Sequence, residues 1–201
     1  MGPVSSILLK TIPNEAQLNL IKSTIETVSL EQKEHNFWVN TTQPIGGNIK
    51  SDGSPFSVNF ENITNINDHY ENNELAQIVS FIGYKPEFSL NLSAMCNGDI
   101  DHKILGELTL YLAKTLNGHI DFGGVVFSLN QLPWYRSANW YLFKASWPKV
   151  EPYFKRFKQN ISGNIFTVHY KTASGKKWAY HISDTEFLES WLKSPEFHMI
   201  K

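Results

Sequence analysis

The stretch Phe88–Gly124 constrains the fold more than any other part of the sequence. Apolar and polar side chains alternate from Phe88 to Ala94, which is the period of a strand with one buried face. After a polar turn, apolar residues recur at helical spacing from about His102 to Leu116, so this segment should form an amphipathic helix. Asn117-Gly118 is a typical helix stop, and a second short strand should follow it and turn at Gly123-Gly124.

The same two periods recur along the rest of the chain. Further strands are expected at Val4–Leu9, Asn36–Asn40 and Phe56–Phe60, together with a hairpin of Ile165–Lys171 and Lys177–Ile182. Further helices are expected at residues 15–29 and 75–82, and a last helix should open at the capping-box pattern Ser183-x-x-Glu186. Turn residues predict a long loop from Pro44 to Pro55. The sequence therefore predicts an α+β protein with a mixed or antiparallel sheet and about four helices.

Two stretches share one order of elements. Val4–Phe37 and Phe88–Phe122 each run from a strand through a polar turn and a helix to a short strand. This order favours two split β-α-β-like halves, residues 1–85 and 86–201, that share one core. A chain of 201 residues can bury such a core, so we expect a single domain over residues 1–201.

Composition narrows the compartment and the class of protein. The chain has one cysteine, Cys96, which fits a reducing compartment, and hydrophobic residues make up 41% of it, which argues against disorder. It contains no apolar run near the roughly 20 residues that cross a bilayer, and its first residues lack the pattern of a secretory signal. We therefore expect a cytoplasmic protein that does not contact a membrane.

Charge is unevenly distributed along a chain whose net charge is only -1. Residues 1–133 contain seven Lys/Arg and fourteen Asp/Glu, a balance of -7, whereas residues 134–177 contain nine Lys/Arg and only Glu151, a balance of +8. One interpretation is a dipolar surface that steers charged partners. The other is that the two segments pair with each other within the fold.

The basic segment is also rich in aromatic residues and predicts a partner-binding surface. Its candidate contact residues are Trp134, Tyr135, Arg136, Trp140, Lys149, Lys155 and Arg156, the last three on a short helix expected at residues 148–158. Trp, Tyr and Arg dominate the binding energy of protein interfaces. Aromatic rings among cations also hold single-stranded nucleic acid, although the net charge of -1 argues against that partner. A third interpretation places the aromatic residues in core strands.

Residues with reactive side chains do not form a recognisable catalytic or metal-binding pattern. Cys96, His102 and Asp121 have the chemistry of a nucleophile, a base and an orienting acid, but nothing in their spacing brings them together. Four histidines are conceivable metal ligands, but their spacing does not match that of a recognisable metal site: His102, His119, His181 and His198. Asp121-Phe122-Gly123 matches the magnesium-binding tripeptide of protein kinases, but the other kinase motifs are missing. We predict no catalytic residue, no metal and no cofactor.

Two motif-rich segments form the basis of a family resemblance. The matching residues are Cys96-Asn97, Asp101-His102, Leu105-Gly106, Gly118 and Ile120–Gly124 in the first, and Tyr180-His181, Asp184, Phe187-Leu188, Trp191-Leu192, Pro195 and Phe197–Met199 in the second. Through them the chain resembles an uncharacterised bacterial family, a domain of unknown function of the immunity-protein type found in polymorphic toxin systems. The aromatic, basic segment 133–158 departs from that pattern.

The resemblance implies a cytoplasmic immunity protein that binds and neutralises a cognate toxin domain by occlusion. The motif residues for which we predict a structural role are Asp101, His102, Asp121, Gly123, Gly124, His181 and His198. Two other functions stay open. One is an enzyme that reverses a modification made by the toxin, with His102 and Asp121 as the first residues to test. The other is a single-stranded nucleic-acid-binding module.

Overall fold

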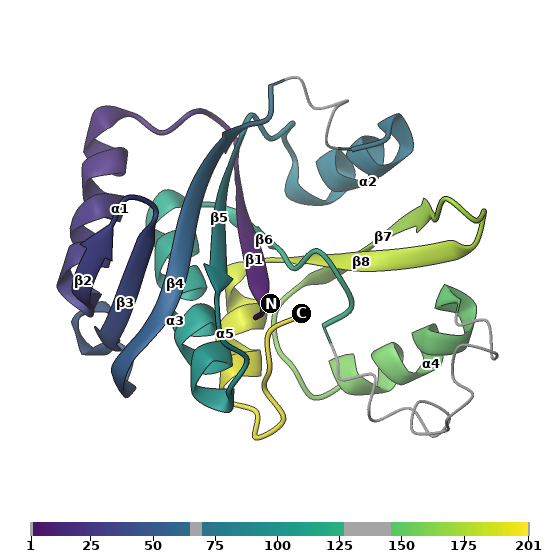
Figure 1. Ribbon diagram of the computed structural model, residues 1–201. Helices are drawn as coiled ribbons and strands as arrows, with labels where there is room; N and C mark the ends of the chain where they lie inside the picture. Colours follow the sequence, from purple (N-terminus) through teal and green to yellow (C-terminus); the bar gives the residue numbers. More distant parts are fainter. Residues whose placement is uncertain (1, 65–69, 127–145, 201) are drawn as a thin grey trace.

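An eight-stranded sheet in which all neighbouring strands are antiparallel forms the centre of the protein (Figure 1). The computed structural model describes residues 2–64, 70–126 and 146–200. The strands are β1 Val4–Leu9, β2 Ser29–Lys33, β3 Asn36–Thr41, β4 Lys50–Asn62, β5 Phe88–Ala94, β6 His119–Asp121, β7 Ile165–Lys171 and β8 Lys177–Ser183, in the spatial order β2-β3-β4-β5-β1-β6-β8-β7. The helices are α1 Glu15–Val28, α2 Asn72–Ile82, α3 Asp99–Leu116, α4 Trp147–Lys158 and α5 Thr185–Leu192, with a 3-10 turn η1 at Gln43–Ile45. The predicted α+β class and antiparallel sheet are confirmed.

Strand β1 lies between β5 and β6 at the centre of the sheet. Because β1 is antiparallel to both neighbours, β5 and β6 run parallel, and α3 connects them. The stretch Phe88–Phe122 therefore forms a split β-α-β unit into which β1 is inserted. In the stretch Val4–Phe37, α1 leads instead to β2 and β3, and β5 and β4 separate β3 from β1.

The larger core lies between the sheet and the helices α1, α3, α4 and α5. Ile7, Leu90 and Leu92 of the central strands are fully buried in it, because alternate residues of β1 and β5 point toward α3. Leu105 and Leu108 of α3 are fully buried against them. Each such leucine contributes about 2 kcal/mol through the apolar surface that it removes from water, so this packing fixes α3 on the sheet.

Helix α2 covers part of the opposite face of the sheet (Figure 1). Its Ile78 and Ile82 pack against Leu8, Val168 and Ile182, which belong to β1, β7 and β8. These residues form a second, smaller core on the face of the sheet opposite α3.

A glutamine of α2 also occupies the free edge of β7. The Gln77 Oε1 accepts a hydrogen bond from the His169 N–H at 2.9 Å, and its Nε2 donates to the His169 carbonyl at 3.0 Å. An edge strand with open N–H and C=O groups is a template for pairing with another chain. The amide of Gln77 satisfies one such pair of groups in β7.

Side chains cap the first turns of α1 and α5. At α1 a reciprocal cap is present: Asn14 Oδ1 accepts from the Gln17 N–H at 2.9 Å, and Gln17 Oε1 accepts from the Asn14 N–H at 3.0 Å. At α5 the predicted cap is wrong by one residue. Ser183 is the buried last residue of β8, and Asp184 caps the helix by accepting from the Phe187 N–H at 2.8 Å. A carboxylate also interacts favourably with the positive end of the helix dipole.

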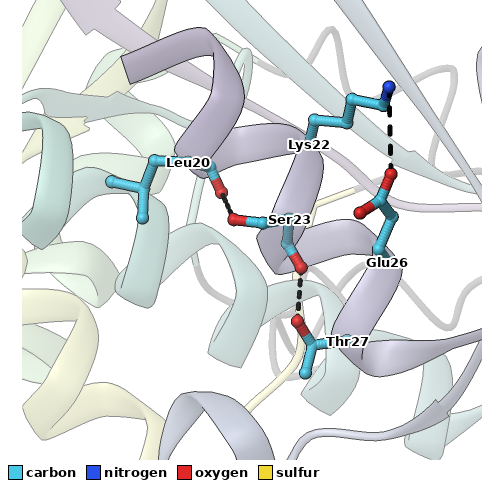
Figure 2. Close-up of polar contacts among 5 residues, drawn as sticks. All are labelled: Leu20, Lys22, Ser23, Glu26 and Thr27. Carbon is cyan, nitrogen blue, oxygen red and sulfur yellow. Dashed lines mark hydrogen bonds and ion pairs between the residues drawn. The ribbon is translucent and has the colours of Figure 1, made fainter. Parts of the chain in front are cut away.

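The outer side of α1 makes its polar contacts within the helix. Figure 2 shows Lys22 and Glu26, whose Nζ and Oε1 atoms lie 3.9 Å apart in an exposed ion pair. It also shows the Ser23 hydroxyl, which donates to the Leu20 carbonyl at 3.0 Å, and the Thr27 hydroxyl, which donates to the Ser23 carbonyl. An exposed pair of this kind is worth less than about 0.5 kcal/mol. This side of α1 is a solvated helix surface.

The predicted loop from Pro44 to Pro55 is shorter than expected, because β4 begins at Lys50. Pro55 lies opposite Trp38 in the β3–β4 ladder, and Gly53 has a φ of 98°. The register of this ladder also shifts near its end. Proline and a glycine of positive φ are tolerated in a strand at such an irregularity, so these turn residues lie within β4.

Candidate functional site

The predicted partner surface is described in part. Four of its residues lie outside the described residues; they are Trp134, Tyr135, Arg136 and Trp140. Lys149, Lys155 and Arg156 lie on α4, and all three are exposed.

Helix α4 separates an apolar side from a basic side. Trp147, Val150 and Phe154 are buried in the larger core. The Lys155 Nζ lies 2.9 Å from Glu151 Oε1 in an exposed ion pair. Residues 146–177 contain seven Lys/Arg and one acidic residue, Glu151. This part of the protein therefore has a charge of +6.

Three further lysines lie on the β7–β8 hairpin, which packs next to α4. Lys171 and Lys177 are opposite each other in the β7–β8 ladder, Lys176 precedes Lys177, and all three are exposed. These lysines were not among the predicted contact residues, although Lys171 ends the first predicted strand of the hairpin and Lys177 begins the second. We call the exposed cations of α4 and the hairpin the basic face: Lys149, Lys155, Arg156, Lys158, Lys171, Lys176 and Lys177.

A pocket of about 360 Å³ lies between α4, the hairpin and α2. Its lining residues are Asn73, Trp147, Pro148, His169, Tyr170, Lys171 and Lys177. Two of the seven cations of the basic face thus line a concave site with aromatic walls.

Asp121, the last residue of β6, is a buried carboxylate on the α2 side of the sheet. Its Oδ2 accepts a hydrogen bond from the Tyr70 hydroxyl at 3.1 Å, and its Oδ1 accepts one from the Gly123 N–H at 2.8 Å. Burial raises the pKa of Asp121 to about 6, even though both hydrogen bonds favour the charged form. Asp121 therefore exchanges its proton close to neutral pH.

Two tyrosines and a glutamate surround Asp121. Burial is the largest cause that raises the pKa of Tyr70 and of Tyr180, and the charges of Asp121 and Glu74 raise both further. The Tyr180 hydroxyl is buried and has no hydrogen-bond partner in the part of the chain that the structure describes. The sequence does not place Tyr70, Glu74 or Tyr180 near Asp121, because their proximity depends on the order of the strands and the position of α2.

His181 is fully buried against α4. Its Nδ1 accepts a hydrogen bond from the Val126 N–H at 3.2 Å, and its ring stacks on Phe154 with centroids 4.0 Å apart. Burial lowers the pKa of His181 to about 3, so the ring is neutral and its proton lies on Nε2. Nε2 has no partner among residues 2–64, 70–126 and 146–200. His181 acts here as a packing residue between β8 and α4.

His102 and His198 lie side by side where α3 meets the C-terminal tail, with ring centroids 6.2 Å apart. Burial and, second, the charge of His198 lower the pKa of His102, whereas a hydrogen bond with the Met199 backbone favours its charged form. The neighbouring Asp101 fixes the start of α3, because its Oδ2 accepts from the Gly98 N–H at 2.8 Å. His102 and His198 thus lie at the contact between α3 and the tail.

Motif glycines allow close packing around the same tail. Gly123 has a φ of 63°, in the left-handed region that favours glycine. A Cβ atom at Gly124 would lie 2.7 Å from Ile200 Cγ2, and one at Gly106 would lie 2.6 Å from Phe197 Cζ. A side chain at either position would displace the tail.

The hypothetical group of Cys96, His102 and Asp121 is not assembled. Cys96 is exposed in the turn before α3, and Asp121 lies on the α2 side of the sheet, whereas α3 packs on the other side. Among the described residues, no group of three or more His, Cys, Asp or Glu side chains could hold a metal ion. None of the helices described here is both long and apolar enough to cross a membrane.

Comparison with known proteins identifies the family. Neither the curated proteins nor the solved structures give a match. A family model matches the whole chain, residues 1–201. The chain belongs to this family, the family of unknown function DUF6368.

Proposed function

We propose that this protein is a cytoplasmic immunity protein that binds a cognate toxin domain and neutralises it by occlusion. The resemblance of its motifs to immunity-type proteins motivates the proposal. The observation that supports it best is the separation of charge on the folded protein. Residues 146–177 carry a charge of +6 and the whole chain a charge of -1, so the rest of the chain carries -7.

Such a dipolar surface suits a protein that must capture a partner quickly. Complementary charge raises association rates from about 10⁵–10⁶ to about 10⁸–10⁹ M⁻¹s⁻¹ at low salt. A toxin that damages its own cell has to be bound before it acts, so a fast association is what neutralisation by occlusion requires.

Co-expression with the toxin domain encoded beside the gene tests the proposal. We expect the cells to survive, and the two proteins to co-elute as a stable, inactive complex in size-exclusion chromatography. A toxin domain from an unrelated system is the control and should neither bind nor be neutralised. Absence of both binding and protection with the neighbouring toxin would contradict the proposal.

The buried Asp121 favours one alternative, an enzyme that reverses a modification made by the toxin. A carboxyl with a pKa of about 6 beside a tyrosine hydroxyl can accept or donate a proton at neutral pH. Asp121→Asn keeps the shape of the side chain but cannot titrate. If the protein is such an enzyme, this variant stays folded but loses protection; if it acts by occlusion, the variant still binds the toxin and protection is kept. His102→Gln is the second variant to test in the same way.

A further inference from the structure

We propose that the pocket between α4, the β7–β8 hairpin and α2 receives acidic side chains of the partner protein and thereby sets the association rate. This inference rests on the proposed function, to which it adds the surface used and the chemistry of the partner. Its support comes from the lysine pair of the hairpin, the two helix ends at the pocket and the shape of the pocket walls.

The positive charges of the two pocket lysines repel each other. Lys171 and Lys177 are directly opposite in the β7–β8 ladder, and like charges in that position destabilise a sheet. No acidic side chain among the described residues forms an ion pair with either of them. A carboxylate that enters the pocket from outside would relieve this repulsion.

Two helices begin at the same pocket. Trp147 and Pro148 are the first residues of α4, and Asn73 lies in the first turn of α2. The first turn of a helix carries a partial positive charge that favours anions. At α2 this charge is offset in part, because Glu74 Oε2 accepts from the Glu71 N–H at 2.9 Å. The first turn of α4 has no acidic residue and no side-chain cap, so its charge acts on the pocket.

The pocket walls fit an acidic side chain better than a nucleic-acid strand. Pro148 and Tyr170 offer apolar and aromatic surface to the methylene groups of a Glu or Asp, and Lys171 and Lys177 can bind its carboxylate. A volume of about 360 Å³ holds one or two side chains. Single-stranded nucleic acid needs a basic groove that follows its backbone. Arg156 and Lys158 instead lie in the last turn of α4, about 14 and 17 Å along the helix axis from Trp147.

Paired substitutions test the inference on the toxin complex. Lys171→Gln with Lys177→Gln removes the charges of the pocket, and Lys33→Gln with Lys50→Gln is the matched control on β2 and β4, far along the sheet. At low salt we expect the pocket variant to associate with the toxin domain about tenfold more slowly in stopped-flow measurements, with a weaker salt dependence. The control variant should match the wild type. Circular dichroism checks that both variants are folded.

The outcomes separate this inference from the proposed function. If the wild type binds the toxin and both paired variants bind at the same rate as it does, the pocket inference is overturned and the proposed function stands. If the wild type does not bind the toxin at all, the proposed function is overturned.

A second measurement tests the pocket without the toxin. A peptide of six glutamates and an oligonucleotide of six thymidines are titrated separately into the full chain while NMR follows the amides of His169, Lys171 and Lys177 and the indole of Trp147. We expect the peptide to shift these signals, and Lys171→Gln with Lys177→Gln to abolish the shifts. Shifts with the oligonucleotide alone would overturn the inference in favour of nucleic acid, and no shift with either probe would overturn it altogether.

Discussion

The region around the C-terminal tail and the basic face use their side chains in opposite ways. Around the tail, the motif residues His102 and Trp191 are buried, and their rings pack on His198 and Phe197 of the tail. On the basic face, the cations of α4 and the hairpin are exposed. These buried motif residues therefore help to specify the core, whereas the exposed cations of α4 and the hairpin give the surface its charge. The following predictions test that difference, beginning with the largest effect.

Trp191→Ala should cost about 3–5 kcal/mol of unfolding free energy, the range for a large aromatic residue removed from a core. Trp191 is fully buried and packs edge-to-face on Phe122 and Phe197, with ring centroids 5.7 and 4.9 Å away. Trp178→Ala on the hairpin is the control, since Trp178 is only half-buried. Urea denaturation measures both. An equal loss of stability in the two variants would remove the distinction between core motif and surface segment.

Asp121 and His181 should give the folded protein opposing pH dependences. The pKa of Asp121 rises from 3.8 to about 6 on folding, so its contribution is fully present below about pH 4 and is lost as the pH rises through 6. The pKa of His181 falls from 6.5 to about 3, so its contribution is present above pH 6.5 and is lost as the pH falls. Between about pH 4 and 6 the two slopes oppose each other.

Asp121→Asn should leave His181 as the main cause of the pH dependence of stability between pH 4 and 6. We expect this variant to lose up to about 1.4 kcal/mol of stability per pH unit on acidification from pH 6 to 4, while the wild type changes little. Denaturation at pH 4, 5 and 6 measures the effect, and Asp52→Asn at an exposed position is the control. A variant whose profile stays as flat as that of the wild type would contradict the two buried titrations.

Gln77→Ala should destabilise the edge strand β7, and we expect this loss of stability to be the smallest of the predicted effects. It removes the two hydrogen bonds to His169 and should cost about 1 kcal/mol. Hydrogen exchange at the His169 amide should become faster, while exchange in β5 stays unchanged. Gln32→Ala on the exposed edge strand β2 is the matched control. Unchanged exchange at His169 would mean that β7 is held by its core residues alone.

The sequence predicts most of the fold because its strongest patterns are local. The alternation in β5 and the apolar stripe of α3 each follow from one face turned toward the core. Strand β5 has the predicted bounds, and α3 ends where predicted but begins at Asp99, three residues before the predicted start. The start of β4 could not be predicted in this way. Pro55 and Gly53 have the chemistry of a turn, and only the irregular ladder with β3 makes them part of a strand.

The candidate site could be predicted to a smaller extent. The exposure of Lys149, Lys155 and Arg156 follows from the amphipathic pattern of α4. The pocket beside Lys171 does not follow from any local pattern, because it forms where two helices and a hairpin meet. The surroundings of Asp121 depend in the same way on the pairing of β6 with β8, which joins residues far apart in the sequence.

The central position of β1 has a consequence for how the chain is made. Its partners are β5 at Phe88–Ala94 and β6 at His119–Asp121, so Ile7, Leu8 and Leu9 emerge from the ribosome long before the strands that cover them. At a translation rate of about 5–20 residues per second, β6 is synthesised on the order of ten seconds after β1. We expect the sheet to close late in synthesis, and the nascent chain to depend until then on chaperones that shield an apolar strand.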